Sequence, residues 1–250
     1  MLVEKIHSGP NHSWFVFARD PDKPQAVIDT NQYLVRAGEE AILFDPGGIE
    51  IFPPMLSALT STIPVDQIDH IFLSHQDPDI GSSLPLWRSV CRPDVKVHIS
   101  RLWTSFVAHF DREATFSVIP DEGARLRLGA IDLEFVPAHY LHSSGNFNVY
   151  DPAAGILFSG DIGAALMPPD DDSGLWVTDF NAHVPMMEGF HRRWMGSEAA
   201  KLDWIERVSR LDVRILAPQH GKMFRGEDVK RFLDWFRRLE VGSAIRRGAA

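Results

Sequence analysis

The sequence predicts an α/β sandwich of mixed sheets. Short apolar runs that end in turn residues alternate with stretches of helical spacing, and hairpin pairs are mixed among them. Four of these runs, at 71–73, 133–136, 156–158 and 215–217, each lead to a His or an Asp. Strand ends that deliver such residues to one crevice are typical of a two-metal site. No linker divides the 250 residues, so residues 1–250 are expected to form one domain.

The expected elements follow one another in order along the chain. Strands are predicted at 14–17, 33–35, 41–44, 71–73, 95–99, 116–119, 126–128, 131–136, 148–150, 156–158 and 215–217. Helices are predicted at 53–59, 82–91, 103–110 and 226–240. One further long amphipathic helix is predicted from the spacing of Phe190, Trp194, Leu202, Ile205 and Val208. Turn residues at 45–48 break the pattern, and 167–174 is the clearest loop.

Composition narrows the classes of partner. The net charge of −9 and the pI of about 5.6 give no basic footprint for a phosphate backbone, so no nucleic-acid partner is expected. Cys91 is the only cysteine, which excludes an intrachain disulfide and fits a reducing cytosol. No signal peptide and no apolar run of membrane-spanning length is evident, so we expect a cytoplasmic protein without a membrane partner.

The first ligand-bearing strand end carries three candidate metal ligands. His75, Asp77 and Asp79 form His-x-Asp-x-Asp. In an extended or loosely turned segment alternate side chains point the same way, so all three are expected to face one pocket.

The other strand ends add further candidates. Asp161 follows a Ser-Gly pair, in which glycine permits close backbone approach, and His220 lies in Pro-Gln-His-Gly. The remaining run is followed by both His139 and His142. Any one of these residues alone is more often a surface, core or capping residue. Their recurrence at four strand ends indicates a shared metal site.

These motifs resemble the metallo-β-lactamase fold superfamily. Within it, the chain is similar to the diiron domain of the flavodiiron proteins, which carry His-x-Glu-x-Asp, a later His, Ser-Gly/Asn-Asp and Pro-x-His-Gly. It is still more similar to the stand-alone oxygen-binding diiron proteins, in His-Gln-Asp-Pro-Asp at 75–79 and in Phe-His-Arg-Arg-Trp-Met at 190–195. The resemblance extends from about Tyr33 to Leu239 and implies an αββα sandwich of two mixed sheets with helices outside.

The resemblance also implies a ligand set. One metal would be held by His75, Asp77, His142 and Asp161, and the second by Asp79, Asp161 and His220, with Asp161 bridging. His142 matches the ligand position because it directly precedes the Ser-Ser-Gly-Asn turn, which leaves His139 at the strand end or beside the ligands. Residues expected to support the ligands are Asp45, Ser74, His139, Ser159 and His191. Trp87, Trp176 and His183 are candidate pocket walls.

The donor chemistry favours iron. Three imidazoles and three carboxylates form a hard, anionic set that suits two Fe ions, with Zn or Mn as alternatives. Two departures from the family matter. Asp77 stands where flavodiiron proteins usually have Glu, and Ile80 stands where many hydrolases of this fold have a His for the second metal.

The function implied is that of a non-haem diiron protein that binds O₂, with no catalytic residues beyond the metal ligands. It would act as an oxygen sensor, or as an O₂/NO reductase that takes electrons from a separate redox partner. No flavodoxin domain and no bound FMN are expected, because no flavin-binding domain fits after Glu240. The alternative is a binuclear zinc hydrolase of a thioester, lactone or phosphodiester, in which a metal-bound water attacks.

Signalling without turnover is the remaining alternative. A separate signalling partner would then read the metal state. Phe236 and Leu239 are candidates for a homodimer or partner surface, and the acidic loop Asp170–Asp172 is a candidate lid.

Overall fold

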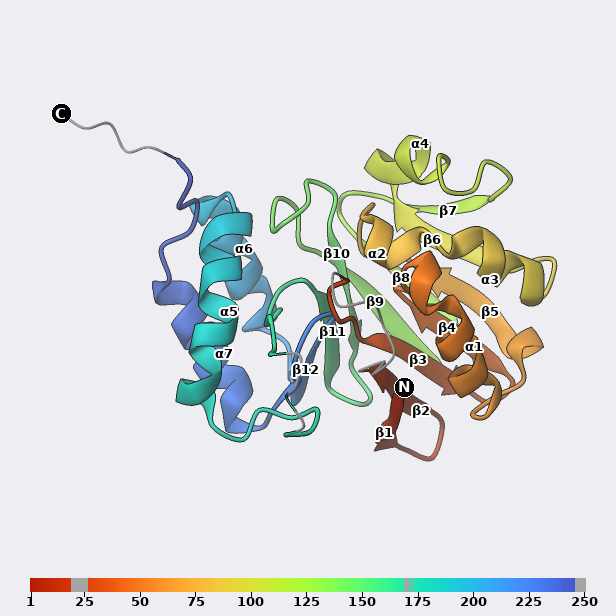
Figure 1. The fold of residues 1–250 in the computed structure, drawn as a ribbon, viewed down its shortest axis with the longest axis horizontal. Coiled ribbons are helices and arrows are strands. Elements are labelled where there is room, and N and C mark those ends of the chain that lie inside the picture. Colours follow the sequence, from red (N-terminus) through yellow and green to blue (C-terminus); the bar gives the residue numbers. More distant parts are fainter. Residues whose placement is uncertain (19–26, 169–170, 172, 246–250) are drawn as a thin grey trace.

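Two β-sheets face each other at the centre of this computed structural model, and helices cover their outer faces (Figure 1). The structure describes residues 1–18, 27–168, 171 and 173–245. Within these residues the first sheet has seven strands in the order β1-β2-β3-β4-β5-β6-β7. The second has six, in the order β13-β12-β11-β10-β9-β8. The predicted α/β sandwich of two mixed sheets is therefore confirmed.

The first sheet combines a meander with parallel strands. Its strands are β1 (Leu2–Ser8), β2 (Ser13–Ala18), β3 (Gln32–Ala37), β4 (Glu40–Phe44), β5 (Ile68–Phe72), β6 (Lys96–Ser100) and β7 (Phe116–Ile119). Strands β1 to β4 pair antiparallel, and β4 to β7 pair parallel. Parallel pairing needs crossover connections. Helices α1 (Phe52–Thr60), α2 (Pro78–Gly81), α3 (Leu84–Val90) and α4 (Thr104–Val107) lie within those connections.

The second sheet brings three strand ends to one edge. Its strands are β8 (Ala124–Leu128), β9 (Ile131–Pro137), β10 (Phe147–Asp151), β11 (Ile156–Gly160), β12 (Ile215–Pro218) and β13 (Phe224–Arg225). Strand β10 is antiparallel to both β9 and β11, and β12 is parallel to β11. Strands β9, β11 and β12 therefore run in the same direction, so the segments that follow them leave the sheet at the same edge.

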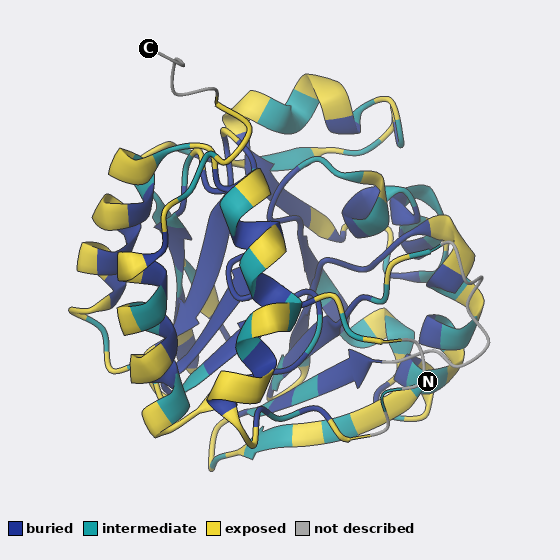
Figure 2. Cartoon of the chain, turned by 60° about the vertical axis from the view of Figure 1, so that its left-hand side comes forward, coloured by how far each residue is buried: buried dark blue, intermediate teal, exposed yellow. Residues whose placement is uncertain are grey.

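Aromatic side chains fill the space between the two sheets. Phe44 and Phe72 come from the first sheet, and Phe135 and Phe158 from the second. The rings of Phe44 and Phe158 stack at 5.4 Å, and those of Phe72 and Phe135 at 5.3 Å. Burying one such side chain contributes about 1.5–3 kcal/mol. The central strands are dark with burial in Figure 2, while the edge strand β1 is mostly exposed and the helices expose their outer faces.

Three helices cover the outer face of the second sheet (Figure 1). They are α5 (Phe180–Trp194), α6 (Glu198–Val208) and α7 (Glu227–Arg238). Their apolar faces form one core cluster with residues of β11 and β12. Within this cluster Lys201 is fully buried, and its Nζ donates to the carbonyl oxygen of Leu239 at 2.6 Å.

The single long helix predicted from Phe190 to Val208 was wrong. The chain forms α5 and α6, separated by a break at 195–197. Met195 is extended because it bridges to Leu141, which no helical residue can do. Ser197 then caps α6, since its Oγ accepts from the main-chain N–H of Ala200 at 3.2 Å.

Other expectations also need correction. The helix predicted at 103–110 is shorter, with a 3₁₀ turn at Arg101–Trp103 followed by α4. Strands β1 and β13 were not predicted. Phe236 and Leu239 do not form a dimer or partner surface, because both are buried among the helices. The proposed lid residues Asp170 and Asp172 lie outside the described residues. No helix in the described ranges is long and apolar enough to cross a membrane.

Candidate metal centre

Residues from both sheets meet at the edge where β5, β9, β11 and β12 end. His75 follows β5 in the first sheet. Asp161 directly follows β11, and His220 lies just beyond β12. The fourth predicted contributor, His142, lies in the loop after β9. All six predicted ligands therefore come from segments that leave the sheets at this edge.

Four of the six side chains form a first group of donors. Asp161 Oδ2 lies 3.5 Å from His75 Nε2 and 3.2 Å from His142 Nε2. Asp77 Oδ2 lies 3.5 Å and 2.9 Å from the same two nitrogens. Donors about 2.1 Å from one ion are about 3.0–3.4 Å apart, so these separations fit a common cation.

A second group forms on the other side of Asp161. His220 Nε2 is 3.2 Å from Asp161 Oδ1 and 3.5 Å from Asp79 Oδ2. The two oxygens of one carboxylate thus face two separate groups. Asp161 Oδ1 is buried and, apart from the close approach of His220 Nε2, has no hydrogen-bond partner among the described residues. A buried anionic oxygen without such a partner is a site that a cation would satisfy, so the donor set fits a pair of metal ions.

The charges within the site shift several pKa values. Burial lowers the pKa of His75, but Asp77 and Asp161 outweigh it and raise that pKa to about 9. For His220, Asp161 likewise outweighs burial and raises the pKa to about 9. Burial raises the pKa of Asp77 and Asp161, yet the imidazoles hold both well below the usual range. Burial raises the pKa of Asp79.

The His-x-Asp-x-Asp segment turns into a short helix, which the sequence prediction of an extended or loosely turned segment did not include. Pro78 occupies the first turn of α2, where its fixed φ favours a helix start. Asp77 precedes this helix in an extended conformation, and Asp79 lies in its first turn. The turn directs Asp77 to His142 and Asp79 to His220. One short motif therefore serves both donor groups.

Hydrogen bonds fix which nitrogen faces the site in two of the three imidazoles, His75 and His220. Ser74 Oγ donates to Asp45 Oδ2 at 2.6 Å, so it must accept from His75 Nδ1 at 3.0 Å. His220 Nδ1 donates to the carbonyl oxygen of Asp29 at 2.8 Å. In both rings Nε2 is left for the site. Asp45 is fully buried, and burial raises its pKa to about 7.

Two supporting residues were missed by sequence reasoning. Gln76 Nε2 donates to Asp77 Oδ1 at 2.9 Å, and Gln76 Oε1 accepts from Ser143 Oγ at 2.9 Å. Gln76 is the second residue of the His-Gln-Asp-Pro-Asp motif, so its place between two predicted ligands could have indicated a supporting role. Asp29 supports His220 through its main-chain oxygen, and no side-chain pattern marks such a contact.

The turn that carries Asp161 is held from two sides. Ser159 Oγ donates to the carbonyl oxygen of Ile162 at 2.6 Å. From helix α5, His191 accepts a hydrogen bond at Nε2 from Gly163 N–H at 2.9 Å, while its Nδ1 donates to Met187 at 2.8 Å. Both residues were predicted to support the ligands, and the structure places both beside this turn.

His139 lies apart from the donor groups. Its Nε2 donates to the carbonyl oxygen of Asp121 at 2.8 Å, and its ring packs edge-on against Phe147 at 5.0 Å. None of the six donor residues is among these contacts. His139 is therefore a strand-end residue, which was one of the two roles expected for it.

Aromatic residues of α5 wall one side of the site. The His142 ring lies 6.0 Å from Phe190 and 5.1 Å from Trp194. Trp194 is 54% exposed, so it lies at the surface rather than in the core. His142 and Tyr140 have φ of 68° and 63°. Left-handed conformations of this kind are costly for non-glycine residues and are often found at functional sites.

The other proposed wall residues pack elsewhere. Trp87 is fully buried against Phe52 behind the first sheet. Trp176 donates from Nε1 to Glu4, and the ring of His183 packs against Phe224. None of these contacts involves one of the six donors.

Comparison with known proteins identifies the family. A sequence profile described as ODP family beta lactamase matches residues 28–221. The chain belongs to this family. ODP-family membership agrees with the metallo-β-lactamase resemblance and with the observed sandwich.

Two kinds of solved structure are similar to this ODP-family chain. A peroxy diiron species of the chemotaxis sensor ODP is 35% identical and covers 98% of both chains, with a TM-score of 0.86. The apo state of that sensor from T. denticola is 36% identical over 97% of this chain and 96% of that one, with a TM-score of 0.86. A flavo di-iron protein mutant from Thermotoga maritima shares the fold at a TM-score of 0.81, with 23% identity over 94% of this chain and 60% of that one.

A curated relative is longer. Diflavin flavoprotein A 1 of Synechocystis is 27% identical over 213 residues, which is 82% of this chain. The ODP-family chain spans only 36% of that protein's length.

Proposed function

We propose that this ODP-family chain is a diiron protein that binds O₂ and acts as an oxygen sensor. The observation that carries the proposal is Asp161, whose two carboxylate oxygens face two separate groups of donors. Support for iron and O₂ comes from the chemotaxis sensor ODP, which was solved as a peroxy diiron species and matches over 98% of both chains.

The proposed ligands divide between two iron ions. The first ion would be held by His75, Asp77, His142 and Asp161 Oδ2. The second would be held by Asp79, His220 and Asp161 Oδ1. With three imidazoles and three carboxylates, the set is harder and more anionic than zinc sites usually are. Two iron ions would supply the oxygen-binding and redox chemistry of the site.

The protein's own residues do the remaining work. Ser74 and the Asp29 carbonyl orient the two imidazoles, so that Nε2 of each points inward. Gln76 holds the Asp77 carboxylate. Phe190 and Trp194 cover His142 and keep water from that side of the site. Asp77 and Asp79 keep side-chain exposures of 30% and 24%, which leaves a way in for a small molecule.

The alternatives are less well supported. A zinc hydrolase of this fold would gain from an imidazole at position 80, but Ile80 is fully buried in the apolar core behind the first sheet. An O₂/NO reductase would need electrons from a separate donor. We further propose one domain over residues 1–250, no FMN bound by this chain, and action in a reducing cytoplasm with a separate signalling partner.

The deciding experiment measures metal content and an optical spectrum. Protein expressed without oxygen should contain about two iron ions per chain, because the donors form two groups. Exposure to air should produce a new visible or near-ultraviolet absorption. If that absorption persists, sensing is favoured over rapid reduction. Two zinc ions and a silent spectrum would instead support the hydrolase.

Single substitutions test the division of ligands. His142→Ala should remove the ion of the first group, and His220→Ala should preferentially empty the second. His109→Ala changes an exposed histidine and is the matched control. Full iron content with unchanged response to air in both ligand variants would refute the assignment.

A further inference from the structure

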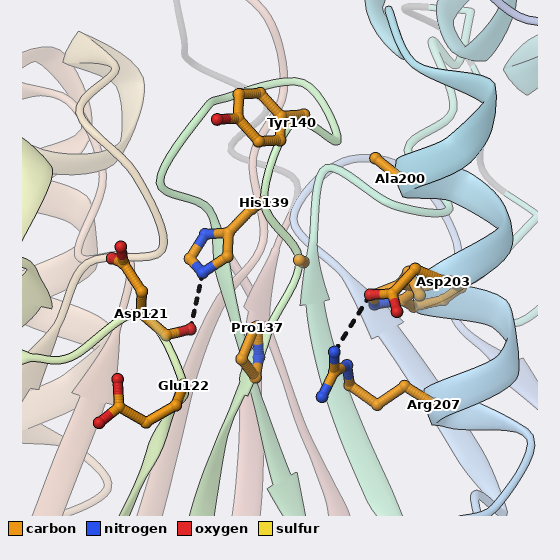
Figure 3. Close-up of a pocket in the computed structure, with 10 residues that line it drawn as sticks. Asp121, Glu122, Pro137, His139, Tyr140, Ala200, Asp203 and Arg207 are labelled. Atoms are coloured by element: carbon orange, nitrogen blue, oxygen red, sulfur yellow. Dashed lines mark hydrogen bonds and ion pairs between the residues drawn. The ribbon is translucent and has the colours of Figure 1, made fainter.

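A groove lies between helix α6 and the end of β9. Its main hollow, of about 410 Å³, is walled by α6 on one side and by the 121–122 turn and the start of the His142 loop on the other (Figure 3). A second hollow of about 340 Å³ shares Glu122, Pro137 and Arg207 with the first. The two hollows therefore adjoin, and we call them together the β9–α6 groove.

The free charge in the β9–α6 groove is negative. Arg207 is paired with Asp203 at 3.1 Å, and Arg125 with Glu134 at 2.8 Å. Asp121 and Glu122 are exposed, and neither side chain has a partner in the described part of the chain. Figure 3 shows both carboxylates clear of the Asp203–Arg207 pair. The groove therefore offers two unpaired carboxylates to a cationic group.

Arginine is the cation that fits these carboxylates best. A guanidinium presents five N–H donors in a planar fork and can pair with a carboxylate through two parallel hydrogen bonds. The ring of His139 only shapes this wall, because its Nε2 donates to the Asp121 carbonyl oxygen and its Nδ1 is buried, out of reach of a ligand in the groove.

The groove wall and the proposed metal site share one loop. Residues 137–140 line the groove, and His142 lies two residues further on, in the first donor group. Tyr140 and His142 are both held in the left-handed region, and Leu141 between them bridges to Met195. Because Tyr140 and His142 are linked through one anchored residue, movement of His142 has a short path to the groove.

We propose that the β9–α6 groove docks an arginine-bearing segment of a partner protein, and that the 137–142 loop carries the state of the metal site to it. The second part rests on the proposed function. Charge complementarity selects a basic partner, since the free groups of the groove are carboxylates and the whole chain has a net charge of −9.

The test is a fluorescence-anisotropy titration with a labelled peptide of alternating arginine and alanine. It is run on metal-free protein, on iron-loaded protein without air, and on the same sample after air. We expect saturable binding that weakens about three- to tenfold in Asp121→Asn/Glu122→Gln. Ala200→Phe, which fills the hollow from α6, should weaken binding further. Wild-type affinity should change at least about twofold between the iron-loaded samples.

Controls separate docking from general attraction. Asp66→Asn/Asp234→Asn removes the same charge outside the groove and should bind like wild type. Equal affinity of this control and the groove variant would overturn docking, as would equal binding of free arginine amide or of a peptide with glutamate for arginine. Equal affinity in all three metal states would overturn transmission. Failure to load iron would count against the proposed function, while the metal-free titration would still decide docking.

Discussion

At His75 the two ring nitrogens have separate tasks. Nδ1 donates to Ser74 Oγ, which itself donates to buried Asp45, and Nε2 faces Asp77 and Asp161. The two hydrogen bonds that link Asp45, Ser74 and His75 thus fix the orientation of the His75 ring before any cation binds. Hydrogen-bonded partners of this kind tune metal affinity although they never touch the ion.

Ser74→Ala should weaken iron binding while leaving the six donors unchanged. Loss of the Ser74 hydroxyl removes the acceptor for His75 Nδ1 and leaves Asp45 with one hydrogen bond fewer. We expect affinity to fall about 10- to 100-fold, measured by competition with a chelator. Ser57→Ala, at an exposed serine of α1, is the control. Equal affinity in the two variants would contradict the positioning role of Ser74.

Iron binding should depend on pH with a definite sign. In the metal-free protein the pKa values of His75 and His220 are raised to about 9, so both rings are protonated at neutral pH. A cation must displace those protons, so apparent affinity should rise with pH and level off above about 9. An indicator dye in weakly buffered solution at pH 7 should register proton release. No release at pH 7 would show that these rings are already neutral.

The same shifts give a stability trend for the metal-free protein. A histidine pKa raised above its unfolded value adds stability that is fully present below about 6.5. That contribution is lost as pH rises through about 9. Urea unfolding of the metal-free protein should therefore show less stability at pH 10 than at pH 7.

At the scale of elements, helix α5 contacts the candidate site in two places, the turn after β11 and the ring of His142. His191 holds the turn after β11, and Phe190 and Trp194 pack on His142. The helix ends where Met195 pairs with Leu141 of the loop that carries His142. Helix α5 therefore contacts both the turn that carries Asp161 and the ring of His142.

His191→Leu should destabilise the fold by about 1–3 kcal/mol, because Gly163 N–H would be buried without an acceptor. Iron affinity should fall as well, since that turn positions Asp161. Urea unfolding and chelator competition measure the two effects. His109→Leu, at an exposed histidine, should change neither. A variant that keeps wild-type stability would show that the Gly163 bond is dispensable.

Sequence periodicity located most of the elements but not their ends. The apolar run before His75 marked β5, and the Pro-x-His-Gly motif marked the end of β12. The break between α5 and α6 was missed because the bridge from Met195 to Leu141 is a contact between distant segments. The helical turn at Pro78 was missed because alternation was extended through a proline that starts a helix.

At the scale of the whole molecule, the site joins the two sheets. His75, Asp77 and Asp79 follow β5 of the first sheet, while His142, Asp161 and His220 follow strands of the second. Rings of Phe44, Phe72 and Phe158 pack between the sheets a few residues upstream of Asp45, His75 and Asp161. Packing of the sandwich therefore sets the distances between the donors.

Iron should raise the unfolding temperature of the whole domain. A ligand that binds only the folded state adds about 2.7 kcal/mol at 100 times its Kd. Because the donors come from both sheets, calorimetry should show one transition that shifts upward as a unit. A separate unfolding transition at lower temperature that does not shift when iron is added would mean that the two sheets unfold independently. In the His142→Ala variant, iron should raise the unfolding temperature by a smaller amount.

The spread of the donors along the chain has a consequence for protein synthesis. The first proposed ligand is His75 and the last is His220, and each donor group needs a residue from the later part of the chain. A nascent polypeptide emerging from the ribosome therefore cannot present both donor groups until His220 has been translated. If the site binds two ions as proposed, occupation of the second group has to be a late event, and a product interrupted before His220 would carry at most the donors of the first group.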